Sequence, residues 1–523
     1  MIAAMRAGFR APLRPRWQGL LGALVLGALV AAGQAPLGLW WIALPALAGV
    51  VWLGSGQRWA ASVAWIGFAA GFGYALAAMF WIVEPFMVEA EVYGWMAPFA
   101  LILMSAGMGV FWALGFGLGA QIGPGPGPGA RGLGIALGMA ASDALRSYVF
   151  TGFPWVLVGH IWIGTPVAQA AAFVGPLGLS LLTMGIAAAP AMAASLRGGR
   201  GGALLGVALL SLGAIWLAGA ARLDAPTPAR TPPVHLRLVQ PNAAQNLKWL
   251  PQYRMKFFDR LLRLTSTPPE PGTPKPDLIV WPETAVPFLL DRPGQGLELS
   301  VQAAGGVPIA MGIQRSQGSR YYNSLAVIGP DAVVRDIYDK SHLVPFGEYM
   351  PFGDFLARFG MTAFAAQVGN GYSAGTGEKL LDLGTLGKVA PLICYEAIFP
   401  QDLMHFPSRP DWILQVTNDA WFGTLSGPYQ HLAQARLRAI EQGLPLARDA
   451  NTGVSALIDA KGRIVASLGM DRAGVLDVTL PASLPKTLYA KLGDGPIIAL
   501  IAALFIVSLL IARIFIDRSV KRH

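Results

Sequence analysis

The chain has 523 residues, of which only 13% are charged, and its mean hydropathy is +0.50. That charged fraction is about half of what an average soluble domain carries, which argues against an ordinary soluble protein. The net charge is +10, but the basic residues flank apolar segments, which indicates a membrane and no nucleic-acid partner.

Apolar segments fill the chain as far as Ala221 and return once near the C-terminus. A helix needs about 20 such residues to cross a hydrocarbon core of ~30 Å. We therefore predict a polytopic α-helical membrane bundle of eight spans. They cover residues 18–33, 36–54, 59–83, 96–120, 132–150, 165–195, 202–221 and 496–516. The N-terminal basic and apolar stretch resembles a secretory signal, but we interpret it as a retained first span.

Charge in the connecting loops predicts the orientation of the bundle. Basic residues precede the first span, follow the last one and occupy alternate short loops, whereas the loop after the third span is acidic. The basic residues are Arg6, Arg10, Arg14, Arg16, Arg58, Arg131, Arg197, Arg200, Arg513, Arg518, Lys521 and Arg522. The acidic residues of the loop after the third span are Glu84, Glu89 and Glu91. The positive-inside rule then places both termini in the cytoplasm and residues 222–491 outside.

Proline-rich breaks divide the chain into parts. GPGPGPG at 123–129 reads as a cytoplasmic connector, and DAPTPARTPP at 224–233 separates the seventh span from the outer domain. The predicted parts are a seven-helix membrane bundle at 1–221, a linker at 222–233 and a periplasmic catalytic domain at 234–491. A C-terminal transmembrane helix and a basic cytoplasmic tail complete the chain at 492–523.

Short β-rich runs and amphipathic stretches alternate within 234–491, which predicts an extracytoplasmic α/β sheet domain with its own core. The expected strands are 234–240, 277–281, 307–313, 324–329, 389–393, 412–417 and 454–459. The expected helices are 251–264 and 429–442.

Three β-like runs in this domain end with a reactive side chain. LIVWPETAVP supplies Glu283, DIYDKSHLVPFGEYMP supplies Lys340, and KVAPLICYEAIFP supplies Cys394, the only cysteine in the chain. Side chains at the ends of neighbouring strands can converge on one crevice. A carboxylate, an ammonium and a thiol suffice for acyl transfer: the carboxylate takes the thiol proton, and the ammonium and the Tyr395 N–H stabilise the oxyanion.

Each of these residues also has an ordinary structural interpretation. A lone cysteine is usually an inert buried side chain, Glu283 could start a helix, and Lys340 could be a solvated surface charge. Glu348 could form only a salt bridge, and Trp249 could be a core or interfacial residue. Two observations favour catalysis. A carboxylate, an ammonium and a thiol each follow a β-like run of the same domain. The thiol is also predicted on the oxidising side of the membrane, where the only cysteine of the chain has no intramolecular disulfide partner.

The Glu–Lys–Cys set, in this chain order, resembles that of the nitrilase superfamily. NDAWFG at 418–423 and RAIEQG at 438–443 agree with it, and the eight flanking spans narrow the resemblance to the apolipoprotein N-acyltransferase family. Further matching stretches are LVQPNAAQNLKW, YYNS, LVPFGEYMP, CYE and TGFPW. Asp143 differs from the glutamate expected in that family; it can pair with Arg146 on the same helix.

The resemblance implies an αββα sandwich and a ping-pong reaction in the bacterial inner membrane. Glu283, Lys340 and Cys394 would transfer an acyl chain from a phospholipid, such as phosphatidylethanolamine, through a thioester to the α-amino group of a diacylglyceryl-cysteine on an apolipoprotein. The supporting residues implied are Glu348, Trp249, Asn323, Tyr395 and Glu396. We expect a monomer. We also expect no metal and no cofactor, since no CxxC, HExxH or Walker pattern occurs.

The apolar arm at 346–375 is consistent with a lipid substrate, because apolar side chains at the bilayer surface can admit acyl tails. Two other functions stay open at this point. A membrane-tethered nitrilase-type amidase would hydrolyse the thioester with water, and a transporter would use the outer domain only to bind substrate.

Overall fold

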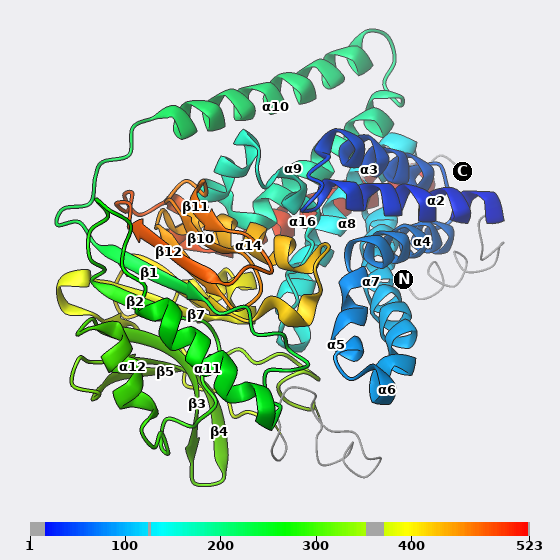
Figure 1. Ribbon diagram of the computed structural model, residues 1–523. Helices are drawn as coiled ribbons and strands as arrows, with labels where there is room; N and C mark the ends of the chain where they lie inside the picture. The colour runs from blue at the N-terminus through cyan, green and yellow to red at the C-terminus, as the bar shows by residue number, and fades with distance from the viewer. Residues whose placement is uncertain (1–15, 124–126, 352–370, 521–523) are drawn as a thin grey trace. The chain divides into compact units, whose positions relative to one another are not determined.

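The computed structural model describes residues 16–123, 127–351 and 371–520, coloured along the chain in Figure 1. It divides into two compact units, one formed by Met1–Ala225 with Leu488–His523 and the other by Pro226–Thr487. The arginines at 6, 10 and 14, the basic residues at 521 and 522, and most of the arm at 346–375 lie outside the described residues.

The first unit is entirely helical in its described part, with helices where the apolar segments predict them. Its helices are α2 (Trp17–Val30), α3 (Trp40–Ser55), α4 (Ala60–Ala78), α5 (Glu84–Met87), α6 (Ala90–Tyr93), α7 (Ala97–Ile122), α8 (Pro128–Tyr148), α9 (Ala171–Ala193), α10 (Arg200–Asp224), α15 (Leu488–Leu492) and α16 (Gly495–Val520).

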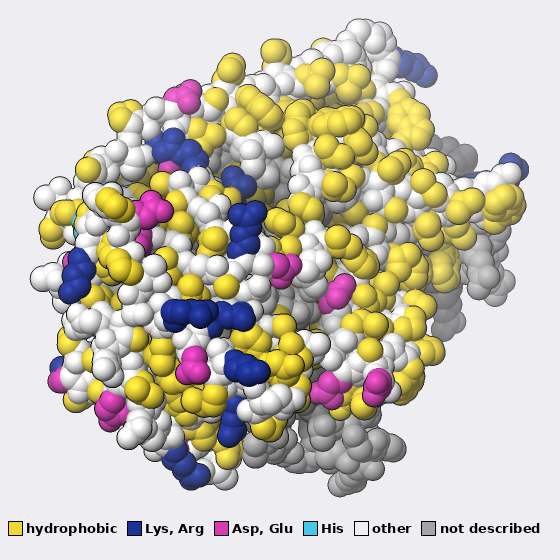
Figure 2. Space-filling view, viewed as in Figure 1, with side chains coloured by type: hydrophobic (Ala, Val, Ile, Leu, Met, Phe, Trp, Pro, Cys, Tyr) yellow, Lys and Arg dark blue, Asp and Glu magenta, His cyan; other side chains and the backbone are white. Residues whose placement is uncertain are grey.

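Several of these helices are suited to a membrane. Among the described residues, five helical stretches are long and apolar enough to cross one, and Trp17–Gly33 and Trp40–Ser55 are shorter apolar helices. The helix α8, at the predicted fifth span, is not one of the five, and it carries Asp143 and Arg146. The helix α10 exposes Leu209 and Leu210 at 68% and 75%, as expected for side chains that face lipid. In Figure 2 hydrophobic side chains dominate the visible face of this unit.

Glycine allows the helices of this unit to approach each other at backbone distance. A Cβ atom on Gly27 of α2 would lie 2.0 Å from the carbonyl oxygen of Ala70 in α4. One on Gly138 of α8 would lie 2.0 Å from the carbonyl oxygen of Gly115 in α7. Any larger residue would push these helix pairs apart, so glycine-rich sequence here specifies close helix packing.

The predicted pair on α8 forms, and both of its residues are buried. Arg146 Nη2 lies 3.1 Å from Asp143 Oδ1, and each side chain is 2% exposed. Arg146 Nη1 also donates to the carbonyl oxygens of Phe153 and Trp155, both at 2.7 Å. The pair therefore holds the TGFPW loop that follows α8, and its charge is compensated inside an apolar environment.

The second unit contains two six-stranded sheets (Figure 1). The first has the order β12-β1-β2-β3-β4-β5, with β1 (His235–Gln240), β2 (Leu278–Trp281), β3 (Ile309–Gln317), β4 (Arg320–Ile328), β5 (Val334–Asp339) and β12 (Gly474–Thr479). The second has the order β11-β10-β9-β8-β7-β6, with β6 (Leu381–Asp382), β7 (Lys388–Ile393), β8 (Trp412–Thr417), β9 (Leu446–Ala450), β10 (Ser455–Ile458) and β11 (Ile464–Leu468).

Each sheet has three parallel strands at its centre and antiparallel strands outside them. β1, β2 and β3 are parallel, as are β7, β8 and β9. The central strands β2, β8 and β9 are buried along their whole length, which explains their apolar runs. Parallel strands end at the same edge of a sheet, so the residues that follow β2, and those that follow β7 and β8, gather at defined edges.

Helices cover the outer faces of the two sheets. α11 (Pro251–Thr265) and α12 (Gly296–Ala304) pack on the first sheet in one hydrophobic core, and α14 (Gly427–Gln442) packs on the second in another. Between the sheets, Ser455 of β10 donates to Gln240 of β1 at 2.6 Å. The arrangement is the αββα sandwich that the resemblance implies. The seven expected strands and two expected helices are present, whereas β6, β9, β11, β12 and α12 were not predicted.

Candidate active site

Cys394 occupies a sharp elbow between a strand and a helix. The buried strand β7 ends at Ile393, and Cys394 begins a 3-10 helix that runs to Ile398. Its φ of +51° lies in the left-handed region, which residues other than glycine seldom adopt. Strain of this kind persists only where the surroundings fix it, and it is common at functional sites. The side chain is 5% exposed.

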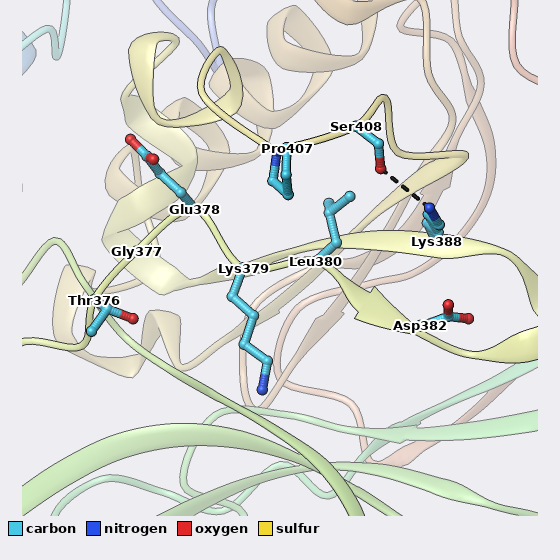
Figure 3. A pocket seen from close by; sticks show the side chains of 9 residues that line it. All are labelled: Thr376, Gly377, Glu378, Lys379, Leu380, Asp382, Lys388, Pro407 and Ser408. Carbon is cyan, nitrogen blue, oxygen red and sulfur yellow. Dashed lines mark hydrogen bonds between the residues drawn. The ribbon is translucent and has the colours of Figure 1, made fainter.

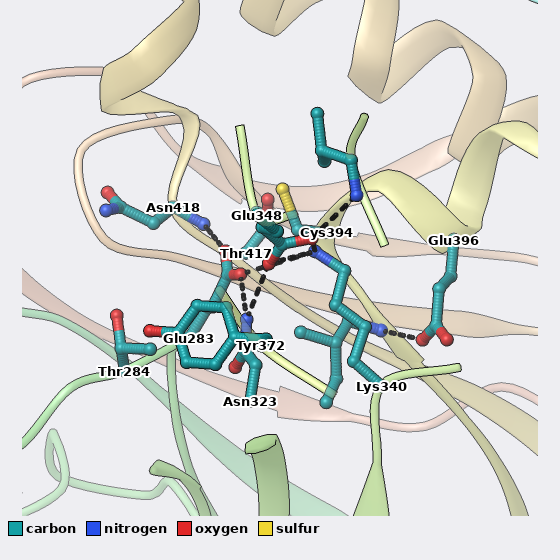
Figure 4. Close-up of polar contacts among 12 residues, drawn as sticks. Glu283, Thr284, Asn323, Lys340, Glu348, Tyr372, Cys394, Glu396, Thr417 and Asn418 are labelled. Carbon is teal, nitrogen blue, oxygen red and sulfur yellow. Dashed lines mark hydrogen bonds and ion pairs between the residues drawn. The ribbon is translucent and has the colours of Figure 1, made fainter. Parts of the chain in front are cut away.

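The structure brings the three predicted catalytic side chains into one buried cluster (Figure 4). Glu283 follows β2, and Lys340 follows β5 in the same sheet, while Cys394 belongs to the other sheet. Lys340 Nζ lies 3.7 Å from Glu283 Oε1, and the charges of both residues act on the Cys394 thiol. Lys340 is 1% and Glu283 6% exposed. The cluster therefore lies between the sheets, with a contribution from each.

Glu348 is a direct partner of Lys340. Its carboxylate lies 2.8 Å from Lys340 Nζ and accepts a hydrogen bond of 2.9 Å from the Val344 amide. Asn323 donates through Nδ2 to both carboxylates, at 2.7 Å to Glu283 and 3.1 Å to Glu348. Glu348 thus forms the salt bridge that the sequence left as an alternative, and the salt bridge belongs to the site itself.

The environment opposes an ionised thiol. Burial and the Glu283 charge raise the pKa of the Cys394 thiol above its ordinary value, although Lys340 acts in the other direction. Burial also raises the pKa of Glu283, against the effect of Lys340. Burial alone would lower the pKa of Lys340, but Glu348 and Glu283 outweigh it and hold that pKa above its usual range. Near neutral pH the cluster therefore contains a neutral thiol, a carboxyl group with raised basicity and a charged lysine.

Glu396 connects the two loops that carry Lys340 and Cys394. Its Oε1 accepts hydrogen bonds from Tyr338 Oη at 2.7 Å, the Ser341 amide at 2.7 Å and the His342 amide at 3.2 Å. Its Oε2 accepts from the Ile393 amide at 2.7 Å. A single buried carboxylate therefore fixes the residues next to Lys340 to the residue before Cys394.

We predict that Glu396→Gln destabilises the protein, because the amide NH₂ replaces one acceptor oxygen and faces donors. Loss of a buried hydrogen bond to a charged group costs about 1.5–3 kcal/mol. Thermal unfolding of the detergent-solubilised protein measures this cost. The matched control is Glu378→Gln, whose carboxylate is 61% exposed and should change the free energy of unfolding by less than about 0.5 kcal/mol. Equal unfolding temperatures for the two variants would contradict this role.

The other predicted residues lie around the cluster in different ways. The Tyr395 ring is buried and packs edge-on against His342 and Phe399, with centroid distances of 5.9 Å and 4.9 Å. Trp249 is half-buried and its ring faces Lys248 Nζ at 5.1 Å. The polar and ring contacts described for Trp249 do not include Glu283, Lys340 or Cys394, and its described neighbour is Lys248.

Several residues at the site were missed from the sequence. The Asn418 amide donates to Glu283 Oε2 at 2.8 Å, and the Thr417 hydroxyl hydrogen-bonds with the Cys394 thiol. Thr417 ends the parallel strand β8 and Asn418 follows it, and that position beside β7 is the signal that could have found them. Tyr372 is close enough to Glu348 and Glu283 for their charges to raise its pKa, with burial the largest cause.

Lys248 is a second buried lysine beside the cluster. Its Nζ lies 3.1 Å from Thr284 Oγ1 and 3.5 Å from the Glu283 carbonyl oxygen. Burial lowers its pKa to about 8, although the Glu283 charge opposes this. Lys248 therefore holds the backbone that presents Glu283, and it carries its charge only part of the time near pH 8.

A surface hollow elsewhere in this domain has a different character (Figure 3). It lies beside β6 and β7 and is lined by Thr376, Gly377, Glu378, Lys379, Leu380, Asp382, Lys388, Pro407 and Ser408. None of these residues belongs to the Glu283–Lys340–Cys394 cluster. Acidic and basic side chains mix in it, and Lys379 pairs with Asp336, so it offers no binding surface of a single charge.

Within the ranges that the structure describes, no group of three or more His, Cys, Asp or Glu side chains could hold a metal ion. Lys340 supplies the positive charge between the two carboxylates.

Both units match family models. Residues 26–189 match the apolipoprotein N-acyltransferase N-terminal domain, and residues 237–487 match the carbon-nitrogen hydrolase domain. The apolipoprotein N-acyltransferase of Rhodopseudomonas palustris is 36% identical over 515 residues, which cover 94% of this chain and 95% of that protein. That of Bradyrhizobium diazoefficiens is 37% identical and covers 93% and 94%. The chain belongs to the apolipoprotein N-acyltransferase family.

Membership of this family makes the chain an acyltransferase that contains a carbon-nitrogen hydrolase domain. A crystal structure of a carbon-nitrogen hydrolase from Helicobacter pylori G27 covers 47% of this chain and 89% of that one, with 15% identity and a TM-score of 0.35. The αββα unit corresponds to the carbon-nitrogen hydrolase domain of the family, and the helical unit contains the region that matches the apolipoprotein N-acyltransferase N-terminal domain.

Proposed function

We propose that this chain transfers a fatty acyl group from a phospholipid, through a thioester on Cys394, to the α-amino group of an N-terminal diacylglyceryl-cysteine. The convergence of Glu283, Lys340 and Cys394 in one buried cluster is the observation that carries the proposal. Family membership supports the lipoprotein acceptor and the phospholipid donor.

The first half-reaction forms the thioester. Glu283 takes the proton from Sγ as Sγ bonds to the ester carbonyl carbon, and the charge on the carbonyl oxygen is stabilised by Lys340 and the Tyr395 N–H. The carbon–oxygen ester bond then breaks, and Glu283 returns the proton to the departing lysophospholipid oxygen. The raised pKa of Glu283 suits both the removal and the return of this proton.

The second half-reaction uses the same groups to break the thioester. The neutral amine of the acceptor attacks the thioester carbonyl carbon, so that a carbon–nitrogen bond forms and the carbon–sulfur bond breaks. Glu283 takes the amine proton and passes it to the departing sulfur. An amide and the free thiol result, and the enzyme is ready for another phospholipid.

The burial of the cluster supports transfer over hydrolysis. Cys394 is 5% exposed, and Glu283 and Glu348 are each 6% exposed. A site shielded from bulk water protects a thioester until the amine arrives. The described ends of the arm at 346–375 join next to the site, where Tyr372 N donates to the Glu348 carbonyl oxygen at 2.8 Å.

The membrane placement is part of the same proposal. We assign the chain eight spans in the bacterial inner membrane, both termini to the cytoplasm, and the catalytic domain to the periplasm, with a monomer as the working unit and phosphatidylethanolamine as donor. The apolar helices and the basic short loops support this placement.

Incubation of the purified protein with phospholipid and a diacylated lipopeptide tests the proposal. We expect a triacylated peptide and one lysophospholipid per turnover, both seen by mass spectrometry. Free fatty acid without triacylated peptide would favour a thioester hydrolase and overturn the transferase function. Replacement of phosphatidylethanolamine by phosphatidylglycerol in a parallel reaction tests the choice of headgroup.

A further inference from the structure

A fully buried polar cluster lies behind the nucleophile, on α14, on β9 and at the start of the 3-10 helix Asp419–Phe422 that follows β8. Its members are Asp419, His431 and Arg448, which are 1%, 0% and 0% exposed. His431 Nδ1 lies 2.8 Å from Asp419 Oδ1, and Arg448 Nη2 pairs with Asp419 Oδ2. The mechanism proposed above uses none of these three residues.

This cluster reaches the backbone of Cys394. His431 Nε2 lies 2.9 Å from the Cys394 carbonyl oxygen, and Gln415 Nε2 is a second donor at 3.3 Å. The Cys394 carbonyl and the ionised Asp419 carboxylate can both only accept, so we assign a proton to each ring nitrogen of His431, with Nε2–H toward the carbonyl and Nδ1–H toward Asp419. Burial and Arg448 lower the pKa of His431, and Asp419 opposes them. Asp419 itself is an anion, because Arg448 and His431 outweigh its burial and hold its pKa below the usual range.

The carbonyl of Cys394 shares a planar peptide unit with the N–H of Tyr395. In a trans peptide the C=O and N–H bonds point in opposite directions. A hydrogen bond that holds the carbonyl toward His431 therefore holds the Tyr395 N–H away from it. This amide lies in the first turn of a 3-10 helix, where it has no intrahelical acceptor, and no described backbone carbonyl outside that helix accepts from it.

We propose that His431, oriented by Asp419 and Arg448, is a positioning residue that holds the Cys394–Tyr395 peptide plane and aims the Tyr395 N–H at the oxyanion. Donation to the carbonyl also polarises the peptide and makes its N–H a stronger donor. The left-handed φ of Cys394 requires such a constraint, since no glycine is present to relax it. The inference rests on the proposed acyl transfer at Cys394.

Two reactions of the same thiol separate this role from a general structural one. Thioester formation builds an oxyanion, whereas alkylation of the thiol by iodoacetamide builds none. Removal of one oxyanion donor typically slows an enzyme about 10²–10³-fold. For His431→Leu, which misaims the donor without removing it, we expect thioester formation to slow about 10–100-fold. The KM for the acyl donor should stay within about twofold, and alkylation within about threefold.

Matched variants complete the test. His431→Gln can still donate to the carbonyl and should recover most of the lost rate. If His431→Leu fails to fold, Asp419→Asn gives the same comparison, because it removes the charge that orients the ring. Equal slowing of both reactions would assign His431 to the thiol or to the fold and overturn the inference, as would unchanged thioester formation.

The donor is supplied both as phospholipid and as a p-nitrophenyl fatty ester, which forms the same kind of oxyanion. A wild-type protein that accepts the ester and rejects phospholipid would overturn the proposed donor. It would leave the comparison of the His431 variants intact, so the two failures are distinguishable.

Discussion

Cys394→Ala abolishes the fatty-acyl mass increment that the wild-type protein acquires from phospholipid. The reason is that Sγ is the only thiol of the chain, and it lies within reach of the charges of Glu283 and Lys340. Loss of a covalent nucleophile reduces turnover on the order of 10⁴-fold or more. Intact-protein mass spectrometry after exposure to lipid measures the increment, and the triacylated peptide measures turnover.

The fold should survive this substitution. Alanine keeps the Cβ atom at the left-handed elbow, so backbone strain hardly changes, and removal of one buried sulfur costs about 1 kcal/mol. The unfolding temperature of Cys394→Ala is the control, and Cys394→Ser is the matched variant. Serine retains a hydroxyl that Glu283 cannot ionise readily, so the Cys394→Ser variant should also fail to form the triacylated peptide. An acyl increment that persists in Cys394→Ala would place the acyl group on another residue.

Lys340→Met should lower both activity and stability. Lys340 Nζ lies 2.8 Å from Glu348 and 3.7 Å from Glu283, and its removal leaves two buried carboxylates close together. An uncompensated buried charge costs about 3–5 kcal/mol. Loss of the ammonium also removes an oxyanion partner, so thioester formation should slow about 10²–10³-fold or more. Rapid-quench mass spectrometry and thermal unfolding measure the two effects.

The two effects of Lys340→Met can be separated with a second substitution. Glu348→Gln in the same chain removes one of the repelling charges, so the double variant should regain stability without regaining rate. Recovery of the rate in the double variant would contradict the role of Lys340 at the oxyanion.

The stability of Lys340→Met should also depend on pH. Without Lys340, only the smaller effects of Asn323 and Lys248 oppose the burial and the Glu348 charge that raise the pKa of Glu283 above its unfolded value. The folded state then binds more protons than the unfolded state above the unfolded pKa, so stability falls as pH rises. The variant should therefore be closer to the wild type at pH 5 than at pH 8. The opposite trend would mean that Glu283 stays ionised without its partner.

Local sequence was sufficient for the strands that end in reactive residues. The apolar runs before Glu283 and Cys394 form β2 and β7, and DIYD before Lys340 forms β5. The runs that form β2 and β7 are continuous because these strands are buried, whereas β5 is an edge strand and mostly half-exposed. The strands β11 and β12 were missed because their residues are mostly half-exposed and their alternation is weak.

Supporting residues were predicted less completely. Asn323 and Glu348 contact the cluster, Glu396 contacts residues beside Lys340 and Cys394, and Trp249 faces Lys248. The NDAWFG match placed Asn418 in a family motif without showing that its amide contacts Glu283, and the sequence contained no cue for His431 behind Cys394, because both contacts join residues far apart in the chain.

By itself, the sequence determined the apolar helical segments, the α/β domain and the three reactive side chains at strand ends. These follow from hydropathy, periodicity and residue chemistry, which are local. Only the tertiary structure decided that Glu348 neutralises Lys340, that Glu396 joins the two catalytic loops, and that His431 holds the Cys394 carbonyl. Such contacts join residues from separate strands and helices, and their distances depend on sheet register and on how two sheets and their helices pack.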